Sequence, residues 1–268
     1  KNKEYAIHCR KKGSLDAKEE IILDENELAE GYDYFALYDK YVSPDNNWLA
    51  FNIDTLSRRF YTIYFKDLRT GKILDTSIPN TEGDDIAWAN DNKTIFYNIR
   101  NAETLRSEKV MKHKLNSSSK DQEVYFEEDE TFSVYSYKTK TDKYIVIGSS
   151  STLSQEFRYL DANNPDGDFK IFQERVHGLE YSIDHFNNKW FIRTNKDGAT
   201  NFKLMVCDEN NTTSNKWNNY LEHREDVLLE NVDFFKNHMV IRSQMLKSAM
   251  VCRKTPVDSV TTELASLV

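Results

Sequence analysis

Short apolar segments recur along this chain at nearly constant intervals. Five of them begin at residues 49, 95, 144, 190 and 239, so that consecutive starts lie 46 or 49 residues apart. Four of the five follow a turn rich in Asp, Asn or Lys, such as Pro44-Asp45-Asn46-Asn47. A period of about 40 to 50 residues that contains several short strands is typical of β-propeller blades. We therefore expect an all-β protein.

Each period contains enough alternating sequence for four strands. In the first full period we expect strands over 35–42, 48–53 and 60–65, followed by a short outer strand from residue 73. The third strand of the next period, 109–115, alternates charged and apolar residues, as a half-buried strand does. Aromatic residues make up 13% of the chain and suit the half-buried faces of such strands.

The pattern predicts a partial propeller over residues 1–243. Four complete four-stranded blades are expected at 32–79, 80–130, 131–176 and 177–226, flanked by half-blades at 1–31 and 227–243. The half-blades could pair into a composite blade or leave an open arc, and the sequence is compatible with both. Because the chain begins inside a blade and without Met, we expect it to be the middle of a longer polypeptide. Residues 244–268 depart from the pattern and are expected to form a helix-prone end or a poorly ordered tail.

Charge and cysteine usage narrow the function classes. The formal net charge is −8, which argues against nucleic acid and anionic membrane surfaces as partners. The three cysteines, Cys9, Cys207 and Cys252, are far apart and odd in number, which favours buried or idle thiols in a reducing compartment. No apolar run reaches 18 residues, so no membrane span is expected. A cytoplasmic location is the expectation, with the periplasm as the alternative.

Several ordered segments resemble one peptidase family. They include Leu56-Ser57-Arg58-Arg59-Phe60-Tyr61, Tyr41-Val42-Ser43-Pro44-Asp45, Arg158-Tyr159-Leu160-Asp161-Ala162, Glu180-Tyr181-Ser182-Ile183-Asp184-His185 and His223-Arg224-Glu225-Asp226-Val227. In their order and spacing they resemble the N-terminal propeller of oligopeptidase B (protease II), a prolyl oligopeptidase-type serine peptidase. The resemblance extends over roughly residues 4–241 and is lost after Ser243.

The resemblance implies a seven-bladed propeller that caps an α/β-hydrolase domain. The hydrolase domain would be C-terminal on the same polypeptide and would carry the Ser, Asp and His that cleave short peptides after Lys or Arg. The propeller would restrict access to that site, and short basic peptides would be the substrates. This chain alone is then expected to be inactive. A stand-alone propeller scaffold that binds a protein or peptide is the main alternative, and a five-bladed carbohydrate-active enzyme is a weaker one.

The residues themselves give no catalytic or cofactor motif. The segment Gly148-Ser149-Ser150-Ser151-Thr152 lacks the second glycine of a Gly-x-Ser-x-Gly nucleophile elbow, so we interpret it as the end of a strand. The six histidines show no metal-binding spacing, and His185 is expected to be structural. We therefore predict no catalytic residue, no metal and no cofactor for this chain.

Two charged groups are candidates for the rim of the propeller tunnel or for contact with a second domain. The acidic run Glu127, Glu128, Asp129 and Glu130 joins two predicted blades and could attract a cationic peptide or pair with the other domain. Arg58 and Arg59 could pair with carboxylates of that domain. A solvated loop for the acidic run, and arginine stems that cover the blade surface, are the simpler alternatives.

Overall fold

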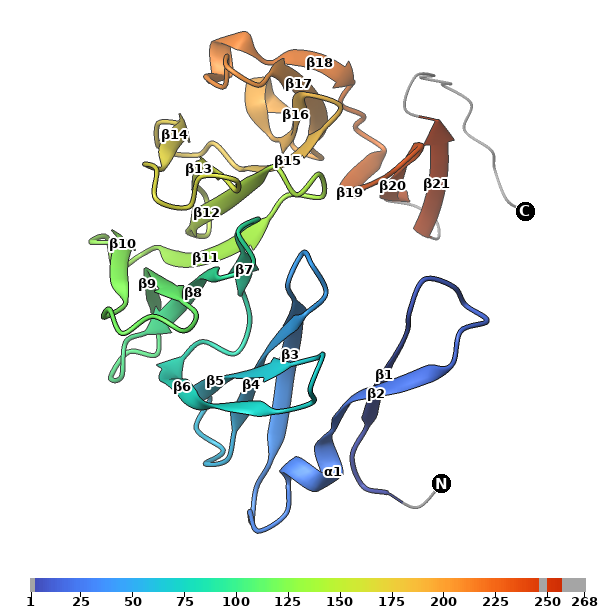
Figure 1. Cartoon of the computed structure of the whole chain (residues 1–268). Coiled ribbons are helices and arrows are strands. Elements are labelled where there is room, and N and C mark those ends of the chain that lie inside the picture. Colours follow the sequence, from blue (N-terminus) through green and yellow to red (C-terminus); the bar gives the residue numbers. More distant parts are fainter. Residues whose placement is uncertain (1–2, 246–249, 257–268) are drawn as a thin grey trace. The chain divides into compact units, whose positions relative to one another are not determined.

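The computed structural model describes residues 3–245 and 250–256, with side chains described up to residue 245. The chain is almost entirely β and divides into two compact units, one of residues 1–137 and 162–166 and the other of residues 138–161 and 167–268. Figure 1 shows the elements in order along the chain. In the first unit they are β1 (Ile7–Lys11), β2 (Glu19–Asp24), α1 (Glu25–Leu28), β3 (Ala36–Val42), β4 (Trp48–Asp54), β5 (Tyr61–Asp67), β6 (Ile73–Thr81), β7 (Ala87–Trp88), β8 (Thr94–Arg100), β9 (Ser107–Lys114), β10 (Gln122–Phe126) and β11 (Ser133–Lys138), which ends at the start of the second unit.

The second unit continues the same alternation of strands and turns. Its elements are β12 (Tyr144–Ser150), β13 (Gln155–Asp161), β14 (Lys170–Gln173), β15 (Tyr181–Phe186), β16 (Lys189–Thr194), the 3-10 turns η1 (Lys196–Gly198) and η2 (Ser214–Lys216), β17 (Lys203–Asp208), β18 (Asn218–Leu221), β19 (Val227–Phe235), β20 (His238–Met245) and β21 (Met250–Pro256). No helix among the described residues is long and apolar enough to cross a membrane.

Successive antiparallel strands form the predicted groups of four. Strands β3 to β6 begin within 32–79, and β6 runs two residues past the predicted boundary, to Thr81. Strands β7 to β10 lie within 80–130, β11 to β14 within 131–176 and β15 to β18 within 177–226. In the first unit a single pair, Thr81 opposite Ile99, joins the first two groups into one eight-stranded sheet. Strands β1 and β2 form a separate two-stranded sheet before them. The all-β propeller fragment expected from the repeat is confirmed.

One turn recurs at the same place in three blades and explains the sequence period. The turn precedes the second strand of each of these blades. The amide of its first residue donates to the carbonyl of the residue five positions later, which begins the strand. The fourth residue of the turn has a positive φ. The three cases are Ser43 to Trp48 with Asn46 at φ 60°, Ala89 to Thr94 with Asn92 at φ 59°, and Thr139 to Tyr144 with Asp142 at φ 57°. Asn and Asp tolerate this left-handed conformation better than most residues. The fourth blade replaces it with a two-residue hairpin at Asn187 and Asn188, both with positive φ, between paired Phe186 and Lys189.

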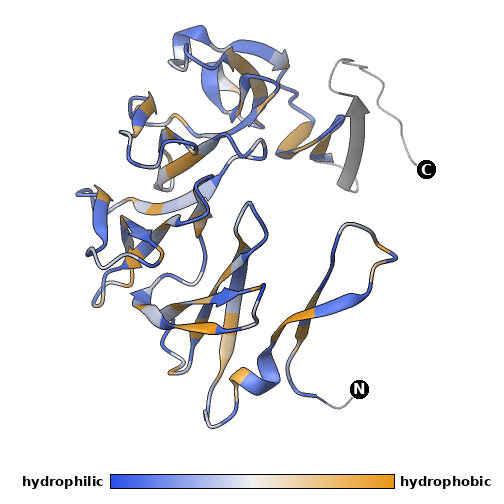
Figure 2. Cartoon of the chain, viewed as in Figure 1, coloured by the Kyte–Doolittle hydropathy of each residue, from blue (hydrophilic) through white to orange (hydrophobic). Residues whose placement is uncertain are grey.

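Alternation along β4 builds two cores in the first unit. Leu49, Phe51 and Ile53 point to one face and pack with Leu23 and Phe35. Ala50 points to the other face, into a cluster with Ile63, Phe65, Trp88, Ile95 and Tyr97 from β5 to β8. The period of two along a strand separates these sets. Figure 2 shows hydrophobic residues concentrated on the strands and hydrophilic residues over most connecting loops.

The second unit has an aromatic core around Trp190. This side chain is fully buried, and its ring centre lies 4.8 Å from that of Tyr144 and 5.3 Å from those of Tyr159 and Phe172. Further along the chain, Phe186 and Phe191 pack with Phe234, Leu229 and Met239, so that β15 and β16 share a core with β19 and β20.

The C-terminal expectation needs correction. The half-blade predicted at 227–243 has a third strand, because β21 (Met250–Pro256) pairs with β20 over seven residue pairs from His238 opposite Pro256 to Gln244 opposite Met250. The prediction of no blade strand after Ser243 is therefore wrong for these residues. Their sequence, three apolar residues followed by two cations, a threonine and a proline, does not alternate, and only backbone pairing reveals the strand. Residues 257–268 of the predicted tail lie outside the described residues.

The described thiols are free, but they are not alike. Cys207 is buried in β17, where burial and the neighbouring Asp208 raise the pKa of its thiol to about 12. Cys9 lies on β1 and is exposed. The side chain of Cys252 lies outside the described residues.

Candidate functional site at the strand-end edge of the first unit

Arg58 and Arg59 lie in the loop between β4 and β5, held by one carboxylate. Asp54 is 2% exposed and accepts the backbone amides of Leu56, Arg58 and Arg59 at 2.8, 3.0 and 2.9 Å. Arg59 has φ 59°, a left-handed conformation that this carboxylate stabilises. The loop backbone is thus fixed, while both guanidinium groups remain exposed.

The acidic run does not behave as a unit. Glu127 is only 4% exposed, and its carboxylate accepts the Tyr125 hydroxyl at 2.7 Å and the Asp129 amide at 3.1 Å. Asp129 caps its own turn by accepting the amide and hydroxyl of Thr131 at 2.9 and 2.7 Å. Glu128 and Glu130 are exposed. Two of the four carboxylates therefore shape the loop, and the other two face solvent.

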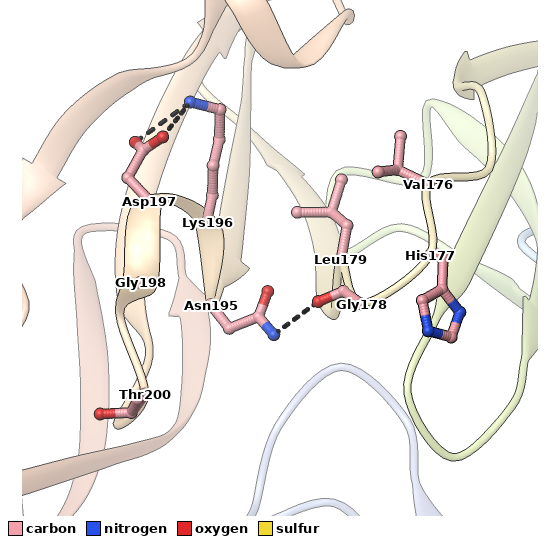
Figure 3. A pocket seen from close by; sticks show the side chains of 9 residues that line it. All are labelled: Val176, His177, Gly178, Leu179, Asn195, Lys196, Asp197, Gly198 and Thr200. Atoms are coloured by element: carbon pink, nitrogen blue, oxygen red, sulfur yellow. Dashed lines mark hydrogen bonds and ion pairs between the residues drawn. The ribbon is translucent and has the colours of Figure 1, made fainter.

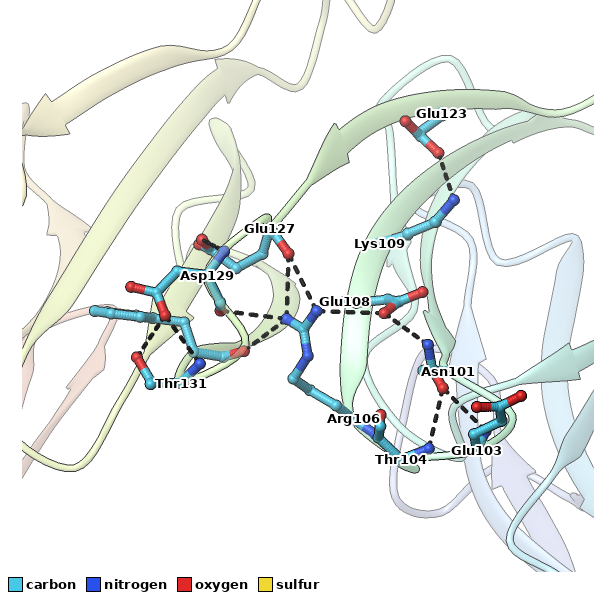
Figure 4. A network of polar contacts seen from close by, with 11 residues as sticks. Asn101, Glu103, Thr104, Arg106, Glu108, Lys109, Glu123, Glu127, Asp129 and Thr131 are labelled. Carbon is cyan, nitrogen blue, oxygen red and sulfur yellow. Dashed lines mark hydrogen bonds and ion pairs between the residues drawn. The ribbon is translucent and has the colours of Figure 1, made fainter.

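A single guanidinium holds this loop against the preceding blade (Figure 4). Arg106, directly before β9, donates through Nη1 to the carbonyls of Glu127 at 3.2 Å and Phe132 at 2.9 Å, and more distantly to that of Asp129 at 3.5 Å. Its Nη2 also contacts the Glu127 carbonyl and the Glu108 carboxylate. A planar guanidinium presents several donors in a fixed fork, so one side chain can hold several carbonyls of this loop at once.

Arg100 connects the two charged groups. It is the last residue of β8, its Nη1 donates to the carbonyl of Arg59 at 3.2 Å, and it forms an ion pair with Glu82 at the end of β6. Six residues later, Arg106 holds the acidic loop. Arg59, Arg100 and Glu127 therefore lie along the same edge of the first unit, where β4, β6, β8 and β10 end. We call this surface the strand-end edge.

The strand-end edge presents both signs of charge on a rigid backbone. Arg58, Arg59, Glu128 and Glu130 have exposed side chains with no hydrogen-bond or ion-pair partner in the part of the chain that the structure describes. Exposed charges of this kind contribute little to stability but can steer and orient a partner. The edge thus has the properties of a surface that could bind a charged partner.

Sequence reasoning missed the two arginines that organise the edge. Arg100 and Arg106 contact carbonyls 41 and 21 to 26 residues away. Their local sequence, one arginine at a strand end and one in a polar turn, carries no signal for such contacts. The nearest hint is that the loop between β8 and β9, which Arg100 and Arg106 flank, is equivalent to the loop at 54–60, since both loops follow the second strand of a blade.

The second unit has a separate hollow of about 390 Å³, shown in Figure 3. Loops 176–179 and 195–200 form its walls, and Asn195 donates to the carbonyl of Gly178 across it at 2.9 Å. The carboxylate of Asp197, which lines the hollow, forms ion pairs with Lys196 and Lys203. The hollow thus offers shape but no unpaired charge for a ligand.

The serine-rich segment and His185 have structural surroundings. Gly148 and Ser149 lie inside β12, paired with Phe157 and Glu156 of β13, and no helix follows as a nucleophile elbow requires. His185 is 1% exposed, and its two ring nitrogens contact the Thr141 hydroxyl at 2.7 Å and the Glu209 carboxylate at 2.6 Å. Burial lowers the pKa of His185 despite the nearby carboxylate.

Comparisons with known proteins agree with this architecture. The family described as prolyl oligopeptidase, N-terminal beta-propeller domain, matches residues 1–254. Dipeptidyl aminopeptidase BI of Pseudoxanthomonas mexicana is 37% identical over 94% of this chain and 37% of its own length. Protease 2 of Moraxella lacunata is 34% identical over 90% of this chain and 35% of its own length. The structure of oligopeptidase B from Leishmania major superposes with a TM-score of 0.86 at 28% identity, over 97% of this chain and 37% of that one.

This chain therefore spans little more than a third of the length of the relatives that it matches. The match ends at residue 254 inside β21, so it includes all but the last two residues of the three-stranded sheet. The repeated four-stranded groups and the match over nearly the whole sequence lead to one conclusion: the chain belongs to the prolyl oligopeptidase N-terminal β-propeller family.

Proposed function

We propose that this chain is the non-catalytic propeller of an oligopeptidase B-like serine peptidase. Its role is to limit access of peptides to a hydrolase domain on the same, longer polypeptide, so that short peptides are cleaved after Lys or Arg and folded proteins are spared. The observation that carries the proposal is the length relation: the chain matches a propeller family over residues 1–254 yet covers only 37% of a peptidase that it resembles at 37% identity.

The strand-end edge is the proposed contact with that hydrolase domain. Its backbone is fixed by Asp54 and Arg106, while Arg58, Arg59, Glu128 and Glu130 keep their charges available. A rigid surface with unpaired charges suits a domain interface, because little conformational entropy is lost when the partner docks.

Activity measurements test the first part of the proposal. The 268-residue chain should not react with a fluorophosphonate probe or cleave a short arginyl amide. The full polypeptide encoded by its reading frame should do both, and should leave a folded protein with the same exposed sequence intact. A reading frame that stops without a Gly-x-Ser-x-Gly segment followed by Asp and His would favour the stand-alone scaffold instead. Labelling of the 268-residue chain itself would refute the assignment.

Charge reversal tests the interface. In the full polypeptide, the double variant Arg58→Glu/Arg59→Glu should lower kcat/KM for the arginyl amide several-fold, while the double variant Lys11→Glu/Lys12→Glu, with two exposed cations on the β1–β2 hairpin, serves as the matched control. Equal activity of both variants would remove the strand-end edge from the interface.

A further inference from the structure

Three carboxylates lie in a strand bulge and a loop beside the strand-end edge. Asp39 lies in a bulge of β3, where the register against β4 shifts between Leu37 and Lys40. Asp84 and Asp85 follow Gly83 in the connection from β6 to β7. None of the three forms an ion pair with a Lys, Arg or His in the part of the chain that the structure describes. Together with the rings of Tyr38 and Tyr61 we call them the acidic–tyrosine cluster.

Each of these carboxylates affects the ionisation of another. Burial raises the pKa of Asp85 to about 7, with further contributions from Asp84 and Asp39. Burial and Asp39 likewise raise the pKa of Asp84, against a hydrogen bond from the Tyr38 hydroxyl that lowers it. Like charges at short range oppose one another's ionisation, and a cation placed among them would relieve this.

Aromatic rings border the carboxylates. Tyr38 is 55% exposed, and its ring centre lies 5.4 Å from that of Tyr61 in an edge-to-face arrangement. Tyr61 in turn lies against the backbone of Gly83, where an added Cβ would come within 2.6 Å of the ring. Glycine is therefore required at position 83 for the ring to approach the loop that carries Asp84 and Asp85.

A buried acceptor below the cluster has no partner. Asn52 is fully buried, its Nδ2 donates to the Gly83 carbonyl at 2.6 Å, and its Oδ1 has no hydrogen-bond partner in the described structure. The strand register places Asn52 opposite the bulge that contains Tyr38 and Asp39. This side chain thus lies between the bulge and the loop that carry the three carboxylates. An unsatisfied buried acceptor costs free energy and indicates a position where an additional hydrogen-bond donor would be stabilising.

The equivalent position in the next blade is complete. Asn98 stands four residues into β8, as Asn52 does in β4. Its Nδ2 donates to Asp85 at 3.2 Å, and its Oδ1 accepts the Ser136 hydroxyl at 3.1 Å. The position equivalent to Ser136, three residues before the recurring turn, is Ile86 for Asn52, and isoleucine cannot donate. The orphan oxygen of Asn52 therefore has a definite cause in the sequence.

We propose that the acidic–tyrosine cluster binds the guanidinium or ammonium group of a peptide segment, with arginine preferred to lysine. Tyr38, which is 55% exposed, offers an aromatic face to the cation, while Tyr61 is buried and supports the Tyr38 ring. Asp39 and Asp84 offer charge-assisted acceptors. A planar guanidinium can stack on a ring and bind a carboxylate at the same time, which an ammonium cannot do equally well. No group of three or more acidic, His or Cys side chains among the described residues is arranged to hold a metal ion, so a nitrogen cation is the better match.

Two sources could supply this group: a substrate peptide, or an arginine elsewhere in a longer polypeptide. The proposal concerns the site itself and does not require the hydrolase domain. Binding to the 268-residue chain therefore tests it independently of the proposed peptidase function.

The binding should depend on pH in a defined direction. Asp85 has a raised pKa of about 7, so it is mostly protonated at pH 6 and mostly ionised at pH 8. The groups that face it are Asp39 and Tyr41 of β3, Asp84 of its own loop, Asn98 of β8, and Tyr135 and Ser136 of β11. Arg100 approaches Tyr38 and Tyr61 but is paired with Glu82. A cation should consequently bind more tightly at pH 8 than at pH 6.

The experiment is a titration of the 268-residue chain with the blocked tripeptide Gly-Arg-Gly, followed by amide chemical shifts. We expect saturable binding with a Kd on the order of 1 mM at pH 8, because one exposed ion pair with a cation–π contact supplies only a few kcal/mol. The same tripeptide with lysine should bind several-fold more weakly, and with uncharged citrulline it should not bind. Affinity should fall several-fold at pH 6.

Variants locate the site. Asp84→Asn and Tyr38→Leu, both at partly exposed positions, should each weaken binding at least five-fold, while the matched control Asp75→Asn on exposed β6 should leave it unchanged. Unchanged amide spectra away from the cluster verify that each variant is folded. Absence of saturable binding at pH 8, or binding that ignores both variants, would overturn the proposal.

The full polypeptide identifies the source of the cation. If a substrate arginine occupies the cluster, Asp84→Asn should raise KM for peptides that carry a second arginine and leave kcat unchanged. If an internal arginine occupies it, the tripeptide should bind the 268-residue chain but not the full polypeptide.

Discussion

At the residue scale, the chain combines side chains that only fix the backbone with side chains that keep their charge available. Arg106 and Asp54 belong to the first kind, since each collects several backbone groups of one loop. Arg58 and Arg59 belong to the second kind, since their side chains are exposed. Asp85 belongs to neither, because burial raises its pKa to about 7 and so suppresses its charge. Arg106 and Asp85 lead to two different predictions.

Arg106→Lys should lower the free energy of unfolding by about 1–3 kcal/mol. A lysine ammonium cannot reach the same set of loop carbonyls, so some of these hydrogen bonds would be lost. The matched control is Arg69→Lys, an exposed arginine paired with Asp67, which should cost clearly less because exposed ion pairs contribute little. Urea unfolding of both variants measures the difference. Equal costs would mean that the fan of hydrogen bonds around Arg106 contributes nothing measurable.

Asp85→Asn should stabilise the protein at high pH. The folded protein binds the Asp85 proton up to about pH 7, whereas the unfolded chain releases it near its ordinary value of 3.8. Stability from this group is thus complete below the unfolded pKa and declines as pH rises toward 7. At pH 8 the variant should gain about 1–2 kcal/mol over the parent, and at pH 4 almost nothing. Asparagine also tolerates the positive φ of 68° found there. Unfolding at both pH values is the measurement, and a gain that is equal at the two would contradict the raised pKa.

At the element scale, strands with regular alternation were predictable and the last strand was not. In β4, apolar residues lie on both faces directly after the recurring turn, and the sequence period revealed the strand. Strand β21 lacks alternation and was predicted as a tail, although it pairs along most of β20. The paired residues lie 6 to 18 positions apart, and a strand of mixed composition such as β21 leaves no alternating pattern in the sequence.

Truncation after residue 245 should therefore expose the edge of β20. Amide hydrogens of β20 that bond to β21 should then exchange at least ten-fold faster, because an unpaired edge loses its ladder bonds. Amides of β4 in the first unit serve as an internal reference. A second truncation after residue 256, which keeps β21, should leave β20 protected. If both truncations behave alike, β21 does not protect β20 in solution.

At the scale of the whole molecule, the repeat predicted the fold class, and the resemblance predicted the family that the match over residues 1–254 confirms. The candidate surfaces were predictable only in part. Arg58, Arg59, Glu128 and Glu130 stood out because adjacent like charges are visible in one sequence. Asp39 and Asp85 did not, because 46 residues and a blade separate them before the fold brings them together.

The net charge of −8 gives a prediction for the entire chain. Association of an arginine-rich peptide should slow by several-fold between about 20 and 200 mM salt, because the Debye length falls from roughly 20 Å to below 10 Å and long-range attraction is screened. Stopped-flow mixing with a fluorescent peptide measures the rate, and its citrulline counterpart is the control. A rate that is insensitive to salt would show that the acidic surface does not steer cations.

Asn52 and Asn98 make the first two blades a comparison within one molecule. They occupy the same position of the repeat. Asn98 uses both its Nδ2 and its Oδ1 in hydrogen bonds, whereas the Oδ1 of Asn52 has no hydrogen-bond partner among the described residues. A duplicated blade can thus hold its structure in one copy while the other copy is released to acquire a new use. In a repeat protein, a position that differs from its equivalents in the other repeats is therefore a good place to look for a function of one repeat alone.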